Sequence, residues 1–157
     1  MGRAPFQVLV FPFRRDQAGR PEYAIFRRAD NDAWQGIAGG GEDDETPMDA
    51  AIREAREEAG VTAAAVLQLA IVGAVADENF RDRGSWDSAL REIPEYAFGV
   101  APESQALSLS SEHREFVWLS VEEALTRLEW ESNRTALREL HRRLLAEQEA
   151  ISDTRAG

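Results

Sequence analysis

Three glutamates, Glu54, Glu57 and Glu58, follow one another at the i, i+3 and i+4 spacing of a helix. At this spacing their side chains rise from one helix face about 5–6 Å apart, where like charges repel one another. A hard divalent cation such as Mg²⁺, or Mn²⁺ as a substitute, would relieve that repulsion and bridge to substrate phosphates. The alternative is a solvated acidic helix face, which the three glutamates alone do not exclude.

The helix that carries these glutamates is predicted to span residues 47–59. Thr46 is suited to be its N-cap and Pro47 its first residue. Asp49 stands three residues after the cap, and Gly60 marks the end of the helix. An apolar stripe at helical spacing is formed by Met48, Ala51, Ile52, Ala55 and Ala59. We expect this stripe to dock the helix on the domain and the glutamates to face away from it.

Hydrophobic patterning along the remaining chain predicts both strands and helices. Strands are expected at 7–13, 23–27, 69–76, 95–100 and 115–119, with helices at 120–128 and 133–149 and fraying from about residue 152. The run Gly39-Gly40-Gly41 is predicted to be a flexible joint in which no regular element continues. Residues 77–92 are predicted to form a long polar loop. The length of 157 residues favours one domain over 1–157, with a core at about 5–150.

The residue types that are missing exclude several kinds of chemistry. The chain has no cysteine, and all 18 basic residues are arginine, so thiolate catalysis, disulfides and lysine Schiff bases are excluded. Only His113 and His141 are present, which leaves oxygen ligands for any metal. The formal charge of −11 makes nucleic acid an unlikely partner. No targeting or membrane-spanning segment is visible, so we expect a cytoplasmic protein without a membrane partner.

The glutamates also belong to a longer spaced pattern. Residues 39–61 read GGGEDDETPMDAAIREAREEAGV and fit G-x5-E-x7-R-E-U-x-E-E-x-G-U, where U is aliphatic. A fortuitous match in a chain of this composition is on the order of 10⁻⁵ or less, so the spacing outweighs the solvated-face alternative. The stretch resembles the signature box of the Nudix hydrolases, with Ala55 smaller than the usual Leu or Ile.

The resemblance implies a Nudix-type α/β/α sandwich with a mixed β-sheet and a catalytic loop–helix–loop. The metal ligands that it implies are Glu54, Glu57, Glu58 and the carbonyl of Gly39. Arg53 and Glu45 resemble the supporting ion pair that orients these glutamates. In such a site, bound metal neutralises phosphate oxygens and lowers the pKa of an attacking water, whose proton a glutamate accepts.

A further carboxylate is expected from the segment SLSSEHREFVWLS, residues 108–120. Family members have a metal-binding or basic glutamate in such an E-H-x-E segment, so Glu112 is the first choice and Glu115 the second. A loop carboxylate without a role is the open alternative for Glu112. Which glutamate acts as general base also stays open. His113 is predicted to be a loop residue rather than a ligand.

Substrate choice depends on residues outside the box. FRRADNDAWQGIAGGGEDDE, residues 26–45, is similar to a segment of the dihydroneopterin triphosphate and dATP pyrophosphohydrolase branch. Arg27 and Arg28 would then contact the outer phosphates, and Trp34 would stack on a pterin or purine ring. A solvated strand end and a packing tryptophan are the open alternatives. A weaker candidate patch comprises Phe80, Arg81 and Trp86.

These observations lead to a functional hypothesis with two alternatives. The first choice is a Mg²⁺-dependent pyrophosphohydrolase that converts dihydroneopterin triphosphate or a purine (deoxy)nucleoside triphosphate to the monophosphate and pyrophosphate. The same metal site would also suit a dinucleoside polyphosphate or capped-RNA-end hydrolase. A non-catalytic nucleotide-sensing Nudix module is the alternative of another class. The expected partner is a small phosphoanhydride substrate, and the oligomeric state is left open.

Overall fold

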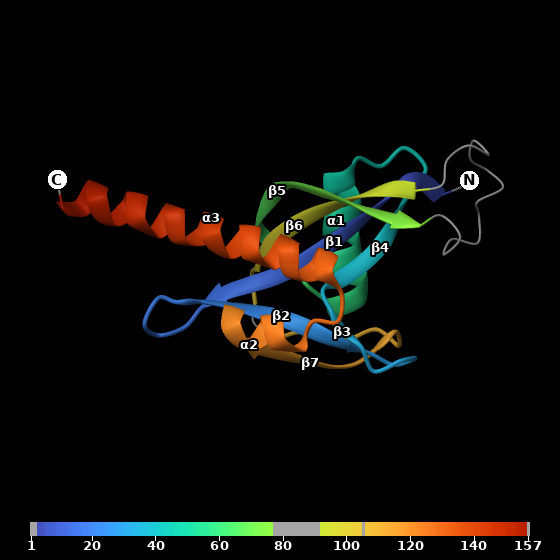
Figure 1. Cartoon of the computed structure of the whole chain (residues 1–157), viewed down its shortest axis with the longest axis horizontal. Coiled ribbons are helices and arrows are strands. Elements are labelled where there is room, and N and C mark those ends of the chain that lie inside the picture. The colour runs from blue at the N-terminus through green and yellow to red at the C-terminus, as the bar shows by residue number, and fades with distance from the viewer. Residues whose placement is uncertain (1–2, 77–91, 105, 157) are drawn as a thin grey trace.

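The computed structural model describes residues 3–76, 92–104 and 106–156 (Figure 1). The predicted patch of Phe80, Arg81 and Trp86, with nearly all of the predicted loop 77–92, lies outside the described residues. The strands are β1 (Arg3–Arg15), β2 (Pro21–Arg28), β3 (Trp34–Gln35), β4 (Ile37–Glu42), β5 (Ala63–Ala76), β6 (Glu92–Pro102) and β7 (His113–Leu119). The helices are α1 (Pro47–Ala59), α2 (Val121–Arg127) and α3 (Glu131–Ala156).

Strand β1 is long enough to join two groups of strands. Its first part pairs with β4 on one side and with β6 on the other, and its last residues pair with β2. Beyond these, β5 pairs with β6, while β3 and β7 pair with β2. Only the β1–β6 pair among the described strands is parallel, so the sheet is mixed. Together with the helices on both faces, this confirms the predicted α/β sandwich.

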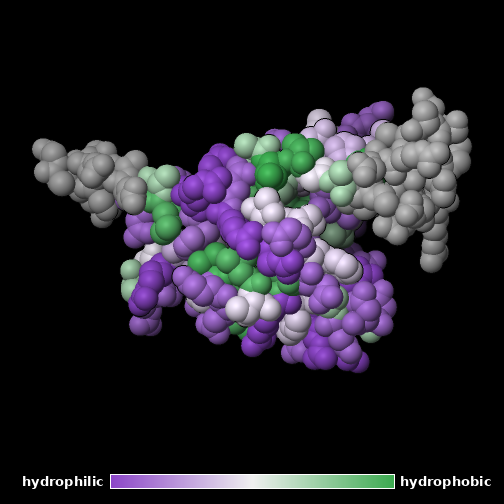
Figure 2. Space-filling model, in the orientation of Figure 1, coloured by the Kyte–Doolittle hydropathy of each residue, from purple (hydrophilic) through white to green (hydrophobic). Residues whose placement is uncertain are grey.

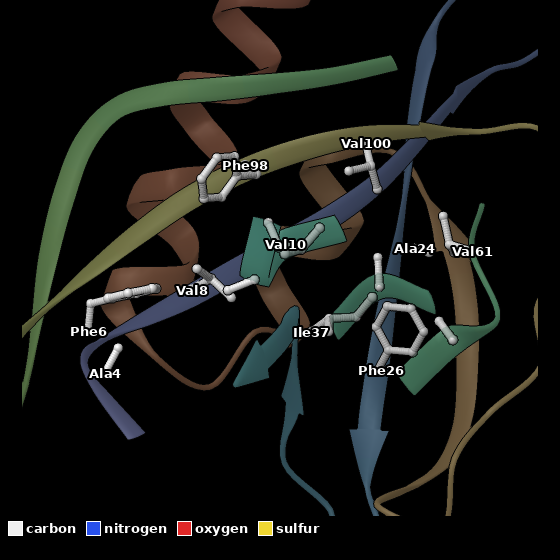
Figure 3. Packing of buried hydrophobic residues seen from close by; sticks show 14 residues of the cluster. Ala4, Phe6, Val8, Val10, Ala24, Phe26, Ile37, Val61, Phe98 and Val100 are labelled. Carbon is white, nitrogen blue, oxygen red and sulfur yellow. The ribbon is translucent and has the colours of Figure 1, made fainter. Parts of the chain in front are cut away.

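The alternation of side chains along β1 separates two hydrophobic clusters. Val8 and Val10 pack in one cluster with four alanines of α1 (Figure 3). Leu9 and Phe11 point to the other face, where they pack with leucines of α3. Helices α1 and α3 therefore cover opposite faces of the sheet, and the last turns of α3 extend beyond it (Figure 1).

Helix α1 has the boundaries and caps that the sequence predicts. The Thr46 hydroxyl accepts a hydrogen bond from the Asp49 backbone N–H at 3.1 Å, and the Asp49 carboxylate accepts one from the Thr46 N–H at 3.2 Å. These two bonds form a capping box. Gly60 ends the helix in the left-handed region, with φ of 65°, where a glycine is favoured.

The prediction of a flexible joint at Gly39–Gly41 is wrong. These glycines lie in β4, where Gly39 pairs with Val8 and Gly40 with Gln7. The reason for the glycines is close approach of other groups, because a Cβ on Gly41 would lie 2.2 Å from the Phe6 ring. Ordering these glycines costs conformational entropy, and the ladder hydrogen bonds and this packing offset that cost.

Three further predictions need correction. The buried face of α1 includes Ala50 but not Met48, which is 37% exposed, because the helix docks through its small alanines. Strand β5 starts at Ala63, well before the predicted 69–76, because it pairs with β6 over its whole length. Helix α3 continues to Ala156 instead of fraying from residue 152. None of the described helices is long and apolar enough to span a membrane.

Glu139 on α3 holds a break in the β5–β6 register. The register shifts between Gln68 and Val72, which leaves backbone N–H groups there without ladder partners. The Glu139 carboxylate accepts from the N–H of Ala70 at 2.7 Å and of Ile71 at 2.8 Å. Burial raises the pKa of Glu139, but these two bonds and Arg143 outweigh it, so the pKa is lowered.

We expect Glu139→Gln to lower the free energy of unfolding by about 1–3 kcal/mol, because an amide can accept only one of the two bonds well. Urea titration measures this difference. Glu147→Gln, at an exposed position of the same helix, is the matched control and should change stability by less than about 0.5 kcal/mol. Equal unfolding midpoints for the two variants would contradict this role of Glu139.

Candidate active site

Arg53 on α1 ties the helix to the end of β4. Its Nε and Nη2 donate to the two oxygens of Glu45 at 2.8 and 3.0 Å, which is a bidentate ion pair. Nη2 also donates to the carbonyl of Gly40 at 3.0 Å. Glu45 lies in the turn between β4 and α1, and the guanidinium holds its pKa below the usual value. The structure thus forms the ion pair that the box resemblance implies.

Glu54 and Glu57 share the remaining nitrogen of Arg53. Nη1 donates to Glu54 at 3.0 Å and to Glu57 at 3.1 Å. The two carboxylates differ in exposure, with side chains 11% exposed at Glu54 and 54% exposed at Glu57. The expectation that all three glutamates face away from the core is therefore wrong for Glu54, because β4 packs over this flank of α1.

Gly39 makes room for the buried carboxylate of Glu54. A Cβ at position 39 would lie 2.2 Å from Glu54 Cδ, so a side chain there would displace the carboxylate. Burial raises the pKa of Glu54 to about 7, against the lowering effect of Arg53, and the charges of Glu58 and Glu57 add to the rise. A carboxylate held against the backbone at such a cost is one that a bound cation would stabilise.

This raised pKa has a consequence for stability. Between pH 4.5 and about 7 the folded protein holds a proton on Glu54 that the unfolded chain has released, so ionisation of Glu54 opposes folding as the pH rises. The pKa values of His113 and His141 are lowered by burial, which gives the opposite slope below pH 6.5. The comparison with Glu54→Gln isolates the effect of Glu54.

We expect the stability of the metal-free protein relative to Glu54→Gln to fall by about 3 kcal/mol between pH 4.5 and 8. Thermal unfolding of both proteins in chelator across this range measures the difference. A constant difference would show that the carboxyl of Glu54 has the same pKa in the folded and unfolded states.

Glu58 is held by a different segment, the one that precedes β7. Ser110 Oγ lies 2.5 Å from Glu58 Oε2, and the Ser110 N–H donates to the Glu58 carbonyl at 3.0 Å. The Glu112 N–H donates to Ser110 Oγ at 3.3 Å. Burial raises the pKa of Glu112, and the adjacent Glu58 carboxylate raises it further. The structure therefore brings Glu112 next to the box, through a serine that the sequence did not single out.

His113 is the first residue of β7, so its prediction as a loop residue is wrong. Its side chain is buried, with its ring 5.4 Å from that of Phe26. Nδ1 lies 3.8 Å from Glu58 Oε2, and neither ring nitrogen has a hydrogen-bond partner among the described residues. Strand register explains this position, because His113 pairs with Arg28 at the end of β2.

The predicted substrate-binding residues have different surroundings. Arg28 donates to both oxygens of Asp30 at 2.8 and 2.7 Å, and these hydrogen bonds raise its pKa, with smaller contributions from the charges of Glu112 and Glu58. Arg27 instead pairs with Glu115 at 2.8 Å. The structure thus places Arg28 beside the carboxylates of the site, whereas Arg27 pairs with Glu115, the second candidate for the further carboxylate.

Trp34 in β3 is half-buried against the hydrophobic cluster that includes Leu9, Phe11 and the leucines of α3. The guanidinium of Arg127 lies 5.4 Å from its ring. The packing alternative is therefore seen for part of this side chain, and stacking on a substrate ring stays a prediction. Asn133, at the start of α3, is buried and accepts from the Gly36 N–H at 2.8 Å, so it fixes the chain between β3 and β4.

Comparison with known proteins identifies the class to which this fold and site belong. Residues 5–140 match the NUDIX domain, so the chain belongs to the NUDIX family and is a Nudix hydrolase. It is similar to the crystal structure of a candidate NUDIX hydrolase from Listeria monocytogenes, at 37% identity and a TM-score of 0.81, covering 92% of this chain and 97% of the other. No curated protein matches the chain.

Two other solved structures are similar over most of their length. The Escherichia coli dihydroneopterin triphosphate pyrophosphohydrolase has 25% identity and a TM-score of 0.66, covering 87% of this chain and 94% of the other. A Caenorhabditis elegans Ap4A hydrolase has 18% identity and a TM-score of 0.66, covering 90% and 98%. The second of these likenesses concerns the fold alone.

Nudix hydrolases use divalent metal ions, and the donors described above fit such an ion. Among the described residues no three His, Asp or Glu side chains converge closely enough to form a metal centre by themselves. Arg53 holds Glu54 and Glu57, while Ser110 holds Glu58. A hard divalent ion that keeps several waters suits this arrangement, because such an ion needs only one or two carboxylates besides substrate phosphates.

Proposed function

We propose that the protein is a Mg²⁺-dependent pyrophosphohydrolase that converts the triphosphate of a purine (deoxy)nucleoside or of dihydroneopterin to the monophosphate and pyrophosphate. Mn²⁺ would substitute for Mg²⁺, and the reaction would take place in the cytoplasm. The proposed metal ligands are Glu54, Glu57, Glu58, the Gly39 carbonyl and Glu112. When bound, the metal supplies neutralisation of phosphate oxygens and a water of lowered pKa.

This proposal rests on one observation, that two sets of carboxylates are held at one edge of the fold. Arg53 holds Glu54 and Glu57 beside β4, and Ser110 holds Glu58 near Glu112. Among Glu54, Glu57 and Glu58, the side chain of Glu57 is the most exposed, so its carboxylate is open to solvent and substrate. The site thus combines buried, fixed acceptors with one that can reach the reacting group.

The residues around these carboxylates have roles in this proposal. Arg53 orients Glu54 and Glu57 and carries the compensating charge. Glu112, whose pKa is raised by burial and by Glu58, is suited to accept the proton of the attacking water, with Glu57 as the other candidate. Arg28, one third exposed beside Glu112, would exchange Asp30 for a phosphate oxygen. Arg27 remains a proposed contact of the outer phosphates, and Trp34 a proposed contact at the edge of the ring.

The substrate class is supported by the likeness to the E. coli dihydroneopterin triphosphate pyrophosphohydrolase, which extends over most of both chains. Hydrolysis of dinucleoside polyphosphates or capped RNA ends is the second candidate. The fold shared with the C. elegans Ap4A hydrolase is compatible with it but does not identify a substrate.

The identity of the products tests this proposal. The protein is incubated with dGTP, dATP, dihydroneopterin triphosphate and Ap4A, with Mg²⁺ or with chelator, and the products are separated by ion-exchange chromatography. Pyrophosphate with a monophosphate is the expected result for a triphosphate, and only with metal. Two nucleotides from Ap4A, with no turnover of any triphosphate, would favour the second candidate. Turnover in chelator at the same rate would contradict the role of metal.

A further inference from the structure

A cavity of about 210 Å³ lies on the α3 face of the sheet, away from the box helix. Strands β1, β5 and β6 form its floor and the first turns of α3 one of its walls. Its lining includes Leu9, Gly73, Glu95, Ala97, Ser132 and Thr135. Figure 2 shows hydrophobic side chains gathered over β5, where Ile71 and Val72 at the rim of the cavity are 38% and 49% exposed. The cavity is therefore mainly apolar, with a few polar groups.

Glu95 is the acidic group at the floor of this cavity. The residue is 6% exposed, and Gln7 Nε2 donates to its Oε2 at 3.2 Å. No salt bridge among the described residues includes Glu95, and burial raises its pKa. A buried carboxylate with one neutral partner costs stability, which favours a role in binding.

The residue of β5 that lies opposite Glu95 does not cover the Glu95 carboxylate. Gly73 pairs with Glu95, and a Cβ at position 73 would come no closer than 3.7 Å to Oε1. Because glycine has no side chain, nothing from this position fills the space beside Oε1. Gln7 donates with its amide nitrogen, so its own Oε1 remains an additional acceptor next to the carboxylate.

Strand register connects the cavity to the catalytic edge. Gln7 pairs with Glu95 on β6 and with Gly40 on β4, so the three residues form a row across the sheet. Two strand spacings separate the ends of this row, roughly 10 Å. Gly40 is the residue whose carbonyl accepts from Arg53. A ribose or a short polyol chain with its phosphates could span from the cavity to the carboxylates of the site.

We propose that this cavity binds the ring of the substrate and that Glu95, supported by Gln7, selects a 2-amino-4-oxopyrimidine ring, which guanine and pterin share. Such a ring presents an N–H and an adjacent NH₂, two donors that match the oxygens of a carboxylate. Adenine presents one NH₂ beside a ring nitrogen acceptor, whose lone pair would face a carboxylate oxygen. The exposed side chains of Ile71 and Val72 provide apolar contact for a flat ring. This inference rests on the proposed triphosphate hydrolysis.

The test compares dGTP, dITP, dATP and dihydroneopterin triphosphate as substrates, with kcat/KM measured from pyrophosphate release. dITP lacks only the 2-amino group of dGTP. We expect the wild-type protein to prefer dGTP over dITP at least 10-fold and over dATP at least 10-fold. The ratio of kcat/KM for dGTP to kcat/KM for dihydroneopterin triphosphate shows whether the preferred ring is guanine or pterin.

Glu95→Gln is the matching variant, because it keeps the shape and the contact with Gln7. It should lower kcat/KM for dGTP or dihydroneopterin triphosphate about 10- to 100-fold and change that for dATP less than 3-fold. Glu22→Gln, on β2 in a salt bridge with Arg14, is the control and should keep the wild-type ratios. Calorimetric titration with dGMP and dAMP in chelator measures ring binding without turnover.

Equal rates for dGTP and dITP in the wild type would overturn the inference, whether or not Glu95→Gln folds. So would unchanged selectivity of a folded Glu95→Gln. Absence of pyrophosphate from every triphosphate is a different result, because it contradicts the proposed function, and the dGMP titration then still tests the cavity. Equal binding of dGMP and dAMP would overturn the inference in that case.

Discussion

Glu57→Gln is expected to lower kcat by about 100-fold or more, because it removes a charge from the carboxylates proposed to hold the metal and touch the substrate. The side chain of Glu57 is 54% exposed, and its described hydrogen bond is the one from Arg53. Arg53 keeps Glu45, Glu54 and the Gly40 carbonyl in the variant. We therefore expect a change in stability of less than about 1 kcal/mol.

Pyrophosphate release under saturating triphosphate and Mg²⁺ measures this effect, and thermal unfolding in chelator measures stability. Glu147→Gln, exposed on α3, is the control for the same chemical change at a distance. A loss of activity that follows a loss of folded protein would assign Glu57 a structural role. Wild-type kcat in a folded Glu57→Gln would remove Glu57 from the catalytic site.

Arg53→Ala is expected to lower the free energy of unfolding by about 3–5 kcal/mol and to abolish turnover. The Arg53 side chain is 13% exposed and donates hydrogen bonds to three carboxylates and a carbonyl, with Glu42 as a fourth carboxylate 3.6 Å from Nη1, so its loss leaves buried negative charge without compensation. The hydrogen bonds to Glu45 raise the pKa of Arg53, Glu54 adds to the rise, and burial opposes it only in part, which agrees with strong attraction in the folded state. Most of the loss comes from Glu45 and Glu54, since Glu57 is half exposed.

Arg53→Lys separates charge from geometry. Lysine keeps one positive charge but cannot make the bidentate contact with Glu45 while also reaching Glu54 and Gly40. We expect about half of the stability loss of Arg53→Ala, with kcat still reduced at least 10-fold. Urea unfolding and pyrophosphate release measure the two effects. Arg56→Ala, one turn along α1 and exposed, is the control, and equal stability of Arg53→Ala and Arg56→Ala would contradict the role of Arg53.

Local sequence signals predicted the catalytic helix well, because its boundaries depend on neighbouring residues. Thr46, Asp49 and Gly60 satisfy the helix ends from within the segment. The glycine run at 39–41 was predicted wrongly for the opposite reason. Its conformation depends on pairing with β1 and on the ring of Phe6, neither of which is visible in the run itself. Exposure of Met48 likewise depends on which residues of β1 and β4 meet α1.

In the site too, features set by neighbouring residues were predicted, and features set by distant segments were not. The resemblance to the Nudix box predicted the contact of Arg53 with Glu45, and helical spacing predicted that Glu54 and Glu57 lie close together. The burial of Glu54 was not predicted, because it depends on β4 covering the helix flank. Ser110 carries no motif of its own, and the segment before β7 brings it to Glu58 through a backbone and a side-chain hydrogen bond. The pairing of Gln7 with Glu95 joins residues 88 positions apart, so it required the structure.

The parallel pairing of β1 with β6 has a consequence for the order of folding. After β1 leaves the ribosome, Val8 and Val10 can pair with β4, but their second partner strand, β6, is synthesised some 88 residues later than β1. The chain between them can form α1 and local strand pairs, but the central strand remains open on one side until β6 arrives. Closure of the core and formation of the Gln7–Glu95 floor are then the same late event. A nascent chain that has not reached this stage has an unprotected sheet edge and no complete ring cavity.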